Sequence, residues 1–357
     1  GANYWQQWEK AATVSFFAND GTGFSLPCGI RIFGAYSRAL EMKSFSCFFR
    51  SIYGAKELNY KLFGDQGIST YEAFVLRNSG QDFKRARMRD ELITSLAAEY
   101  ITLDVQKYRP AVLYLNGEFW GVYYIKEKIN ENFIAGNHNI PADSVVLARA
   151  NGTDSNEYQE LIRYVRTHDL SNEEYYQYVI DRIDKENYID YICAEIYIAN
   201  QDNGNIRFYK SNAMDGKWRW ILYDVDQSFA SATHPTVAEH LNPAGTGAYD
   251  MFSTALINAL LKNSSFKEEF LRRLAWQMNT IWTEENVRGR INELKGLIQQ
   301  DMERDFQKWN WSKSSWESHV NNLIYFQKSR YAQLYNQIKS YFSLTDEQMA
   351  AYGYKRQ

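Results

Sequence analysis

The sequence predicts an α+β protein with two lobes, a small β-rich N-terminal lobe with one main helix and a larger, mostly helical C-terminal lobe. Short apolar runs typical of strands fill most of residues 12–128. Helical periodicity dominates after residue 128, and a single strand–turn–strand segment interrupts it within residues 199–229. A chain of 357 residues is long enough for two such lobes. We therefore expect the lobes to comprise residues 1–128 and 129–357.

The N-terminal lobe contains the clearest hairpin of the chain, AVLYLNGEFWGVYYI. The Asn116-Gly117 dipeptide at its centre supplies the positive φ angles of a tight two-residue turn. Apolar residues at Met88, Leu92 and Leu96 recur at helical spacing. We expect the main helix of this lobe at about residues 86–100.

The C-terminal lobe contains a second hairpin, in which IRFYK and WRWILYD flank a turn that contains Gly216. Ser171 or Asn172 is the expected N-cap of one of the surrounding helices. Residues 231–250 contain Pro and Gly without periodicity, so we expect a long loop there.

Composition excludes several classes of function. The 40 basic and 43 acidic residues are well mixed, so a nucleic-acid partner is not expected. No apolar run approaches the roughly 18 residues of a membrane span, so membrane insertion is not expected either. The three Cys residues lack the spacing of a zinc site, and at most one disulfide could form. The opening GANYWQQWEK lacks the regions of a signal peptide, so an exported protein would have lost its signal beforehand.

Polar residues flank the second hairpin on both sides: Asp202 and Asn205 precede it, and Asp224 and Asp226 follow it. Mg²⁺ takes carboxylate and amide oxygens as ligands and completes its shell with substrate phosphates. Phosphoryl transfer also needs a separate Asp that orients the attacking hydroxyl and accepts its proton. The alternative is a plain turn, because Asp-Asn-Gly-Asn is also typical of tight turns. The two acids after the second strand favour the metal site.

A Gly-containing loop in the N-terminal lobe carries Ser37 and Arg38, and Lys43 follows at the head of a predicted strand. This loosely resembles a phosphate-covering loop and the strand lysine of kinases, although it has one Gly where the kinase loop has three. A surface turn with a solvated Lys explains the same residues, and the sequence does not separate the two interpretations.

The predicted helix supplies acids that could hold that lysine. We expect Asp90 or Glu91 to pair with Lys43, although acids in the first turn are also favoured by the helix dipole. Arg77 and Asn78 lie just before the helix and either cap it or reach the phosphates.

Five blocks, in order along nearly the whole chain, resemble the CotH kinase family, the spore coat protein H group of atypical protein kinases. The resemblance implies an atypical protein-kinase-like bilobal fold with a hinge near Glu127. Gln227 stands where relatives often carry an aromatic residue after the second Asp. The blocks are GIRIFGAYSR with KSFSCFFR, FVLRNSGQDFKRARMRDELITSLA, YRPAVLYLNGEFWGVYYIKEKIN, YIANQDNGNIRFYK and GKWRWILYDVDQSF.

The resemblance also implies roles for individual residues, with ATP and Mg²⁺, or Mn²⁺, as cofactors. Asp202 is the expected catalytic residue. The expected metal ligands are Asn205 and Asp224, assisted by Asp226, and the expected nucleotide contacts are Ser37, Arg38, Lys43, Arg77, Asn78, Glu91 and Glu127.

By this resemblance the protein is a kinase that phosphorylates Ser or Thr of a spore-coat or cell-envelope protein, and it is located in the coat or exported. One alternative is a pseudokinase that acts as an assembly scaffold. Another is a glycan-processing protein that uses paired carboxylates beside Trp309 and Trp316. We favour it less, because Trp residues at such spacing are typical of a core.

Overall fold

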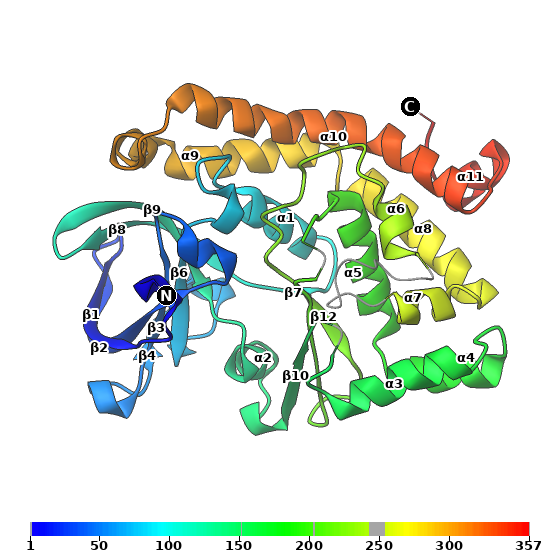
Figure 1. Ribbon diagram of the computed structural model, residues 1–357, viewed down its shortest axis with the longest axis horizontal. Coiled ribbons are helices and arrows are strands. Elements are labelled where there is room, and N and C mark those ends of the chain that lie inside the picture. Colours follow the sequence, from blue (N-terminus) through cyan, green and yellow to red (C-terminus); the bar gives the residue numbers. More distant parts are fainter. Residues whose placement is uncertain (1, 151, 203, 243–253, 357) are drawn as a thin grey trace. The chain divides into compact units, whose positions relative to one another are not determined.

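The computed structural model describes residues 2–150, 152–202, 204–242 and 254–356 (Figure 1), and these form an α+β protein, as predicted. The chain divides into two compact units. Unit 1 comprises residues 1–91, 106–145 and 293–319, and unit 2 comprises residues 92–105, 146–292 and 320–357. The lobe boundary at residue 128 and the kinase-like arrangement of two lobes stay predictions. No helix among the described residues is both long enough and apolar enough to cross a membrane.

Unit 1 is built on a six-stranded antiparallel sheet with the order β1-β2-β3-β6-β9-β8. Its strands contain the Phe, Tyr, Val and Ile residues that favour a pleated, half-buried surface. The strands are β1 (Lys10–Phe17), β2 (Gly23–Phe33), β3 (Ser44–Phe48), β6 (Ala73–Arg77), β8 (Tyr108–Leu115) and β9 (Glu118–Glu127).

The predicted hairpin of unit 1 is confirmed as β8 and β9. Its turn residues Asn116 and Gly117 have φ angles of +50° and +84°, and Leu115 pairs with Glu118. These angles are those of the tight turn that matches strand twist.

Smaller elements complete unit 1. A two-stranded sheet joins β4 (Leu58–Asn59) to β5 (Thr70–Tyr71), and helix α2 (Glu131–His138) begins at Asn130, whose side chain accepts a hydrogen bond from the amide of Phe133. The 3₁₀ helices of this unit are η1 (Asn3–Trp5), η2 (Tyr36–Ala39), η3 (Ser51–Tyr53), η4 (Gly64–Gln66), η5 (Gly80–Asp82) and η6 (Ala142–Ser144).

The core of unit 1 includes tryptophans from the end of helix α9 (Glu284–Trp309) and the start of α10 (Lys313–Tyr341). Trp309 and Trp316 are buried, and their indole N–H groups donate to the carbonyls of Trp120 and Ala86. As expected, these tryptophans fill a core, which removes the argument for a glycan-processing site beside them.

Unit 2 contains a four-stranded sheet with the order β10-β11-β12-β7. The second predicted hairpin is confirmed as β11 (Arg207–Ser211) and β12 (Arg219–Leu222), which pair antiparallel. Strand β7 (Asp104–Val105) runs parallel to β12, and β10 (Val145–Arg149) follows β11 in the sheet; Val145 itself belongs to unit 1.

Helix α5 (Lys185–Ile198) forms the centre of unit 2 and packs against α8 (Ser264–Thr280) (Figure 1). Every residue of α5 from position 187 to 198 is buried, which is typical of a core helix. The other helices of this unit are α3 (Asn156–Thr167), α4 (Glu173–Ile180), α6 (Thr236–His240), α7 (Ala255–Leu260) and α11 (Asp346–Tyr352). Helix α1 (Arg89–Ala98), like α9 and α10, has residues in both units.

Two local predictions in unit 2 have clear outcomes. Asn172 is the N-cap of α4, because its side chain accepts from the amides of Glu174 and Tyr175. The long loop expected at residues 231–250 is wrong in its first half, where α6 forms. That short helix buries Val237 and His240, so packing provides what local periodicity does not. Residues 243–253 lie outside the described part of the chain.

Candidate functional site

The end of helix α5 positions the first two candidate residues. Ala199 takes a left-handed conformation, with φ +53°, and ends the helix. The buried side chain of Asn200 then accepts a hydrogen bond of 3.0 Å from the amide of Asp202. The amide of Asn205 in turn donates to the carbonyl of Asp202 at 3.1 Å. These bonds place Asp202 and Asn205 on one tight turn, which joins α5 to β11.

The segment after β12 positions the remaining candidates. Asp224 has a φ of +55°, a conformation that is uncommon for a residue other than Gly. Five residues on, the amide of Phe229 donates to the carbonyl of Ile198 at 2.8 Å, which ties this segment to the end of α5. Phe229 is buried among aromatic rings, so the segment is anchored at its far end. The unusual backbone of Asp224 therefore lies between strand β12 and the anchored Phe229. Such uncommon backbone conformations are often found at functional sites.

The two segments bring three of the predicted residues together. The side-chain amide nitrogen of Asn205 donates to Asp224 Oδ2 at 2.5 Å and to Asp202 Oδ2 at 3.4 Å. Asp226, the fourth, is 2% exposed in the same segment as Asp224. The predicted turn is thus present, and its Asp202 and Asn205 side chains converge with Asp224, while a metal site there stays a prediction.

The electrostatic setting of Asp202 is unfavourable for its charge. Partial burial raises the pKa of Asp202, and the negative charge of Asp224 raises it further. A hydrogen bond with the side chain of Gln227 has the opposite effect. Gln227 therefore contacts the predicted catalytic carboxylate.

The donors fit a hard cation only if Asn205 takes part. Among the described residues, no three His, Cys, Asp or Glu side chains are arranged to hold a metal ion. Two carboxylates and one amide oxygen are nevertheless ligands that Mg²⁺ accepts when phosphates complete its shell. In this structure the amide N–H of Asn205 faces the two carboxylates. A rotation of the Asn205 side-chain amide by about 180° would place its oxygen where its nitrogen now lies.

Glu195 on α5 is a buried acid that the sequence analysis did not single out. It is 3% exposed, and burial raises its pKa to about 7. Hydrogen bonds with Asn200 and Tyr191 oppose this shift, and the charge of Asp202 adds to it. The sequence feature that could have identified Glu195 is its place as a single acid inside the apolar run YICAEIYIAN. A glutamate in such a run is expected to be buried, and buried glutamates usually have a partner.

The ion pair predicted for Lys43 is wrong, because another lysine takes its place. Lys126 on β9 is buried and forms ion pairs with Asp90 and with Glu91, the latter at 3.3 Å. Burial by itself lowers the pKa of Lys126, but the two acids outweigh it and raise the pKa overall. The Lys43 ammonium donates instead to the carbonyls of Arg38 and Leu40.

Arg77 lies next to this ion pair. It sits on β6 opposite Tyr124, two residues from the partner of Lys126, and its charge lowers the pKa of Lys126. Alternation along the strands puts the two cations on the same face of the sheet. Burial raises the pKa of Glu91, and Lys126 opposes that shift. The structure therefore gathers two buried cations and two buried acids in unit 1.

Three other residues that were predicted to contact the nucleotide instead contact groups of unit 1. The Arg38 guanidinium donates to the carbonyls of residues 4, 6 and 32, at 2.6 to 2.8 Å. Asn78 accepts from Ser44 Oγ at 2.7 Å and from the amide of Gly80. Ser37 is buried beside Gly34, where an added Cβ would lie 2.1 Å from Ser37 Oγ. These contacts hold the loop together, and a nucleotide role for the three residues stays a prediction.

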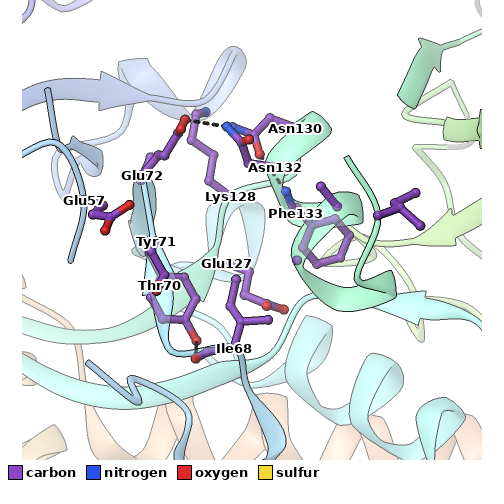
Figure 2. A pocket seen from close by; sticks show the side chains of 14 residues that line it. Glu57, Ile68, Thr70, Tyr71, Glu72, Glu127, Lys128, Asn130, Asn132 and Phe133 are labelled. Atoms are coloured by element: carbon purple, nitrogen blue, oxygen red, sulfur yellow. Dashed lines mark hydrogen bonds between the residues drawn. The ribbon is translucent and has the colours of Figure 1, made fainter. Parts of the chain in front are cut away.

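Glu127, predicted beside the adenine, lines a pocket of unit 1 (Figure 2). Its carboxylate accepts hydrogen bonds from the amide of Lys107 at 2.9 Å and from the side chain of Asn137 at 3.1 Å. Its backbone carbonyl accepts from the side chain of Gln106. The groups of Glu127 are thus engaged within unit 1, and its contact with adenine stays a prediction.

The site belongs to an α+β protein that gathers two carboxylates and an amide at the two ends of one hairpin. Comparison with protein families places this chain: the family described as CotH kinase protein matches residues 30–334. The match covers most of the chain, which therefore belongs to the CotH kinase family, as the sequence blocks indicated. A search of curated proteins found no match.

Proposed function

We propose that the protein is an ATP- and Mg²⁺-dependent kinase that transfers a γ-phosphate to Ser or Thr hydroxyls of a protein. The observation that carries the proposal is the hydrogen-bonded convergence of Asp202, Asn205 and Asp224 at the ends of the β11–β12 hairpin. Membership in a family named for kinase activity supports it.

Each residue of this cluster has a proposed role. Asp224 and Asn205, assisted by Asp226, would hold Mg²⁺, which neutralises the charge of the phosphates when it is bound. Asp202 accepts the proton of the acceptor hydroxyl while the new oxygen–phosphorus bond forms and ADP leaves. Its raised pKa supports this role, because a base works best when its pKa approaches the working pH.

We also propose roles for a lysine and an arginine of unit 1. We assign to Lys126 the role that the sequence suggested for Lys43, because Lys126 is the lysine held by helix acids. Arg77, on the same face of the sheet, is the second proposed cation. A lysine held by acids keeps its charge and its position when it is buried.

The acceptor and the location rest on the family alone. We propose a spore-coat or cell-envelope protein as the acceptor, and the coat or the exported compartment as the location.

One observation favours a second candidate, a pseudokinase that acts as an assembly scaffold. The Asn205 amide N–H already bonds to both carboxylates, and it occupies the position that a cation would take. A chain that kept this arrangement would bind Mg²⁺ poorly and would not transfer phosphate.

Transfer of radiolabel from γ-³²P-ATP to Ser- and Thr-containing peptides separates these candidates. The proposed kinase labels them in Mg²⁺, and Asp202→Asn lowers the rate by about 10² to 10⁴-fold, the usual contribution of a positioned base. Asp143→Asn, at an exposed position of η6, is the control for the change in charge. Equal labelling by the wild type and Asp202→Asn contradicts the role of Asp202, and no labelling by either favours the scaffold.

A further inference from the structure

The pocket that Glu127 lines in unit 1 is formed by apolar side chains, here called its floor, and by the exposed glutamates Glu57 and Glu72, here called its rim (Figure 2). Its volume is about 270 Å³. Pockets for cofactors and drug-sized ligands begin at about 300 Å³, so this one suits a single long side chain better than a nucleotide. The floor is apolar and is formed by Ile68, Tyr71, Phe133, Ala135 and Ile140, from β5, α2 and the segments beside them.

The carboxylates of the rim accept hydrogen bonds from neutral side chains. Glu57 accepts a hydrogen bond from Asn59 at 3.2 Å, and Glu72 accepts one from Asn132. Both donors are neutral amides. Two exposed negative charges therefore stand at the mouth of the pocket.

The other charged groups of the pocket are occupied elsewhere. Glu127 is 2% exposed and has the ammonium of Lys107 at 3.9 Å. Lys128 holds its ammonium over the rings of Phe33 and Phe48, at 5.2 and 5.4 Å from the ring centres. Such cation–π contacts stabilise the lysine where it is. The lining thus carries the carboxylates of Glu57, Glu72 and Glu127 against the single ammonium of Lys128, and acidic groups outnumber basic ones.

We propose that this pocket binds an arginine side chain on an exposed peptide segment of a partner protein. The aliphatic part of such a side chain would cover the apolar floor, and the guanidinium would reach the rim. A guanidinium presents several N–H groups in one plane and bonds well to carboxylates, so two glutamates at the mouth favour arginine. The pocket shares no residue with the Asp202 cluster, and the proposal does not depend on the proposed kinase activity.

Calorimetric titration with the peptide acetyl-Ser-Gly-Arg-Gly-Ser-amide tests the proposal. The full chain should bind it saturably at a ratio of one to one, and the same peptide with neutral citrulline in place of arginine should not bind. Glu57→Gln/Glu72→Gln should weaken binding by about 5-fold or more, because two ion pairs are lost. Added salt should weaken it as well.

Glu118→Gln/Glu303→Gln changes the charge of unit 1 by the same amount at exposed positions outside the pocket, and it should bind like the wild type. Ala135→Leu keeps both rim carboxylates but fills the floor, and it should also abolish binding. Equal binding of the citrulline peptide, or equal loss in the two double variants, overturns the proposal. Binding of Ca²⁺ without binding of the arginine peptide overturns it too, because the rim would then be a cation site.

Discussion

The side-chain amide of Asn205 donates a 2.5 Å hydrogen bond to Asp224, and so joins the turn before β11 to the segment after β12. The same amide lies 3.4 Å from Asp202. A neutral donor thus stands between two carboxylates that repel each other. We infer that a cation, when bound, would replace this N–H and gain from both charges.

Asp224→Asn should stabilise the protein in metal-free buffer. The substitution removes the charge that raises the pKa of Asp202, and Asn tolerates a positive φ at least as well as Asp. We expect the free energy of unfolding in urea to rise by about 1 kcal/mol, the upper end of what one solvent-exposed charge pair contributes. Asp143→Asn should leave it unchanged. A loss of stability in Asp224→Asn would contradict the repulsion.

Lys126→Met should destabilise unit 1 strongly. The substitution leaves Asp90 and Glu91 buried without their ammonium, and such a loss costs about 3 to 5 kcal/mol. Lys43→Met is the matched control, because the Lys43 ammonium donates to backbone carbonyls of its own loop and lies over the ring of Tyr4 at 4.4 Å. Urea unfolding of both variants measures the difference. A larger cost for Lys43→Met would return the structural role to the loop lysine.

The same two variants bear on the proposed nucleotide contact. If Lys126 neutralises the phosphates, the thermal stabilisation of the wild type by ATP and Mg²⁺ should disappear in Lys126→Met and persist in Lys43→Met. The opposite pattern would restore the role that the sequence suggested for Lys43.

Glu195→Gln should change how stability depends on pH. The pKa of Glu195 is about 7 in the folded protein against an ordinary value of 4.5, and burial is the main cause. The folded state holds this proton more tightly, so the contribution to stability is complete below about pH 4.5 and is lost as the pH rises through 7. The variant cannot ionise. Its advantage in unfolding free energy over the wild type should grow by roughly 2 kcal/mol between pH 5 and pH 8.

A control for that experiment is Glu174→Gln, at an exposed position of α4. Its difference from the wild type should stay flat over the same range of pH. A flat difference for Glu195→Gln as well would mean that the buried carboxyl does not titrate there.

Local sequence was enough to predict the hairpins and the residues at their ends. Asn116-Gly117 has few alternatives to a tight turn, and the apolar strands on either side fix the pairing. The sequence alone predicted that Asp202, Asn205 and Asp224 lie close together, because the two ends of a hairpin are neighbours in space. These are short-range relations that a sequence carries.

The lysine of the ion pair could not be predicted in the same way. YYIKEKIN offers Lys126 and Lys128 on one face of a strand, with Glu127 on the other. Which lysine meets the acids of α1 depends on strand register, here Val75 opposite Lys126. The sequence made Lys43 an equally plausible partner of the acids, but in the structure its side chain donates to the carbonyls of Arg38 and Leu40. Register and the path of a flexible side chain depend on tertiary packing, which no local pattern contains.

The central claim is that Asn205 and Asp224 hold one divalent cation beside Asp202, and the most direct test is a titration with Mn²⁺ followed by electron paramagnetic resonance. The wild type with a non-hydrolysable ATP analogue should bind Mn²⁺ at least about 10-fold more tightly than Asp224→Asn, because one charged ligand is worth more than 1.4 kcal/mol. Asp143→Asn should match the wild type. Equal affinity in the wild type and Asp224→Asn would contradict the account.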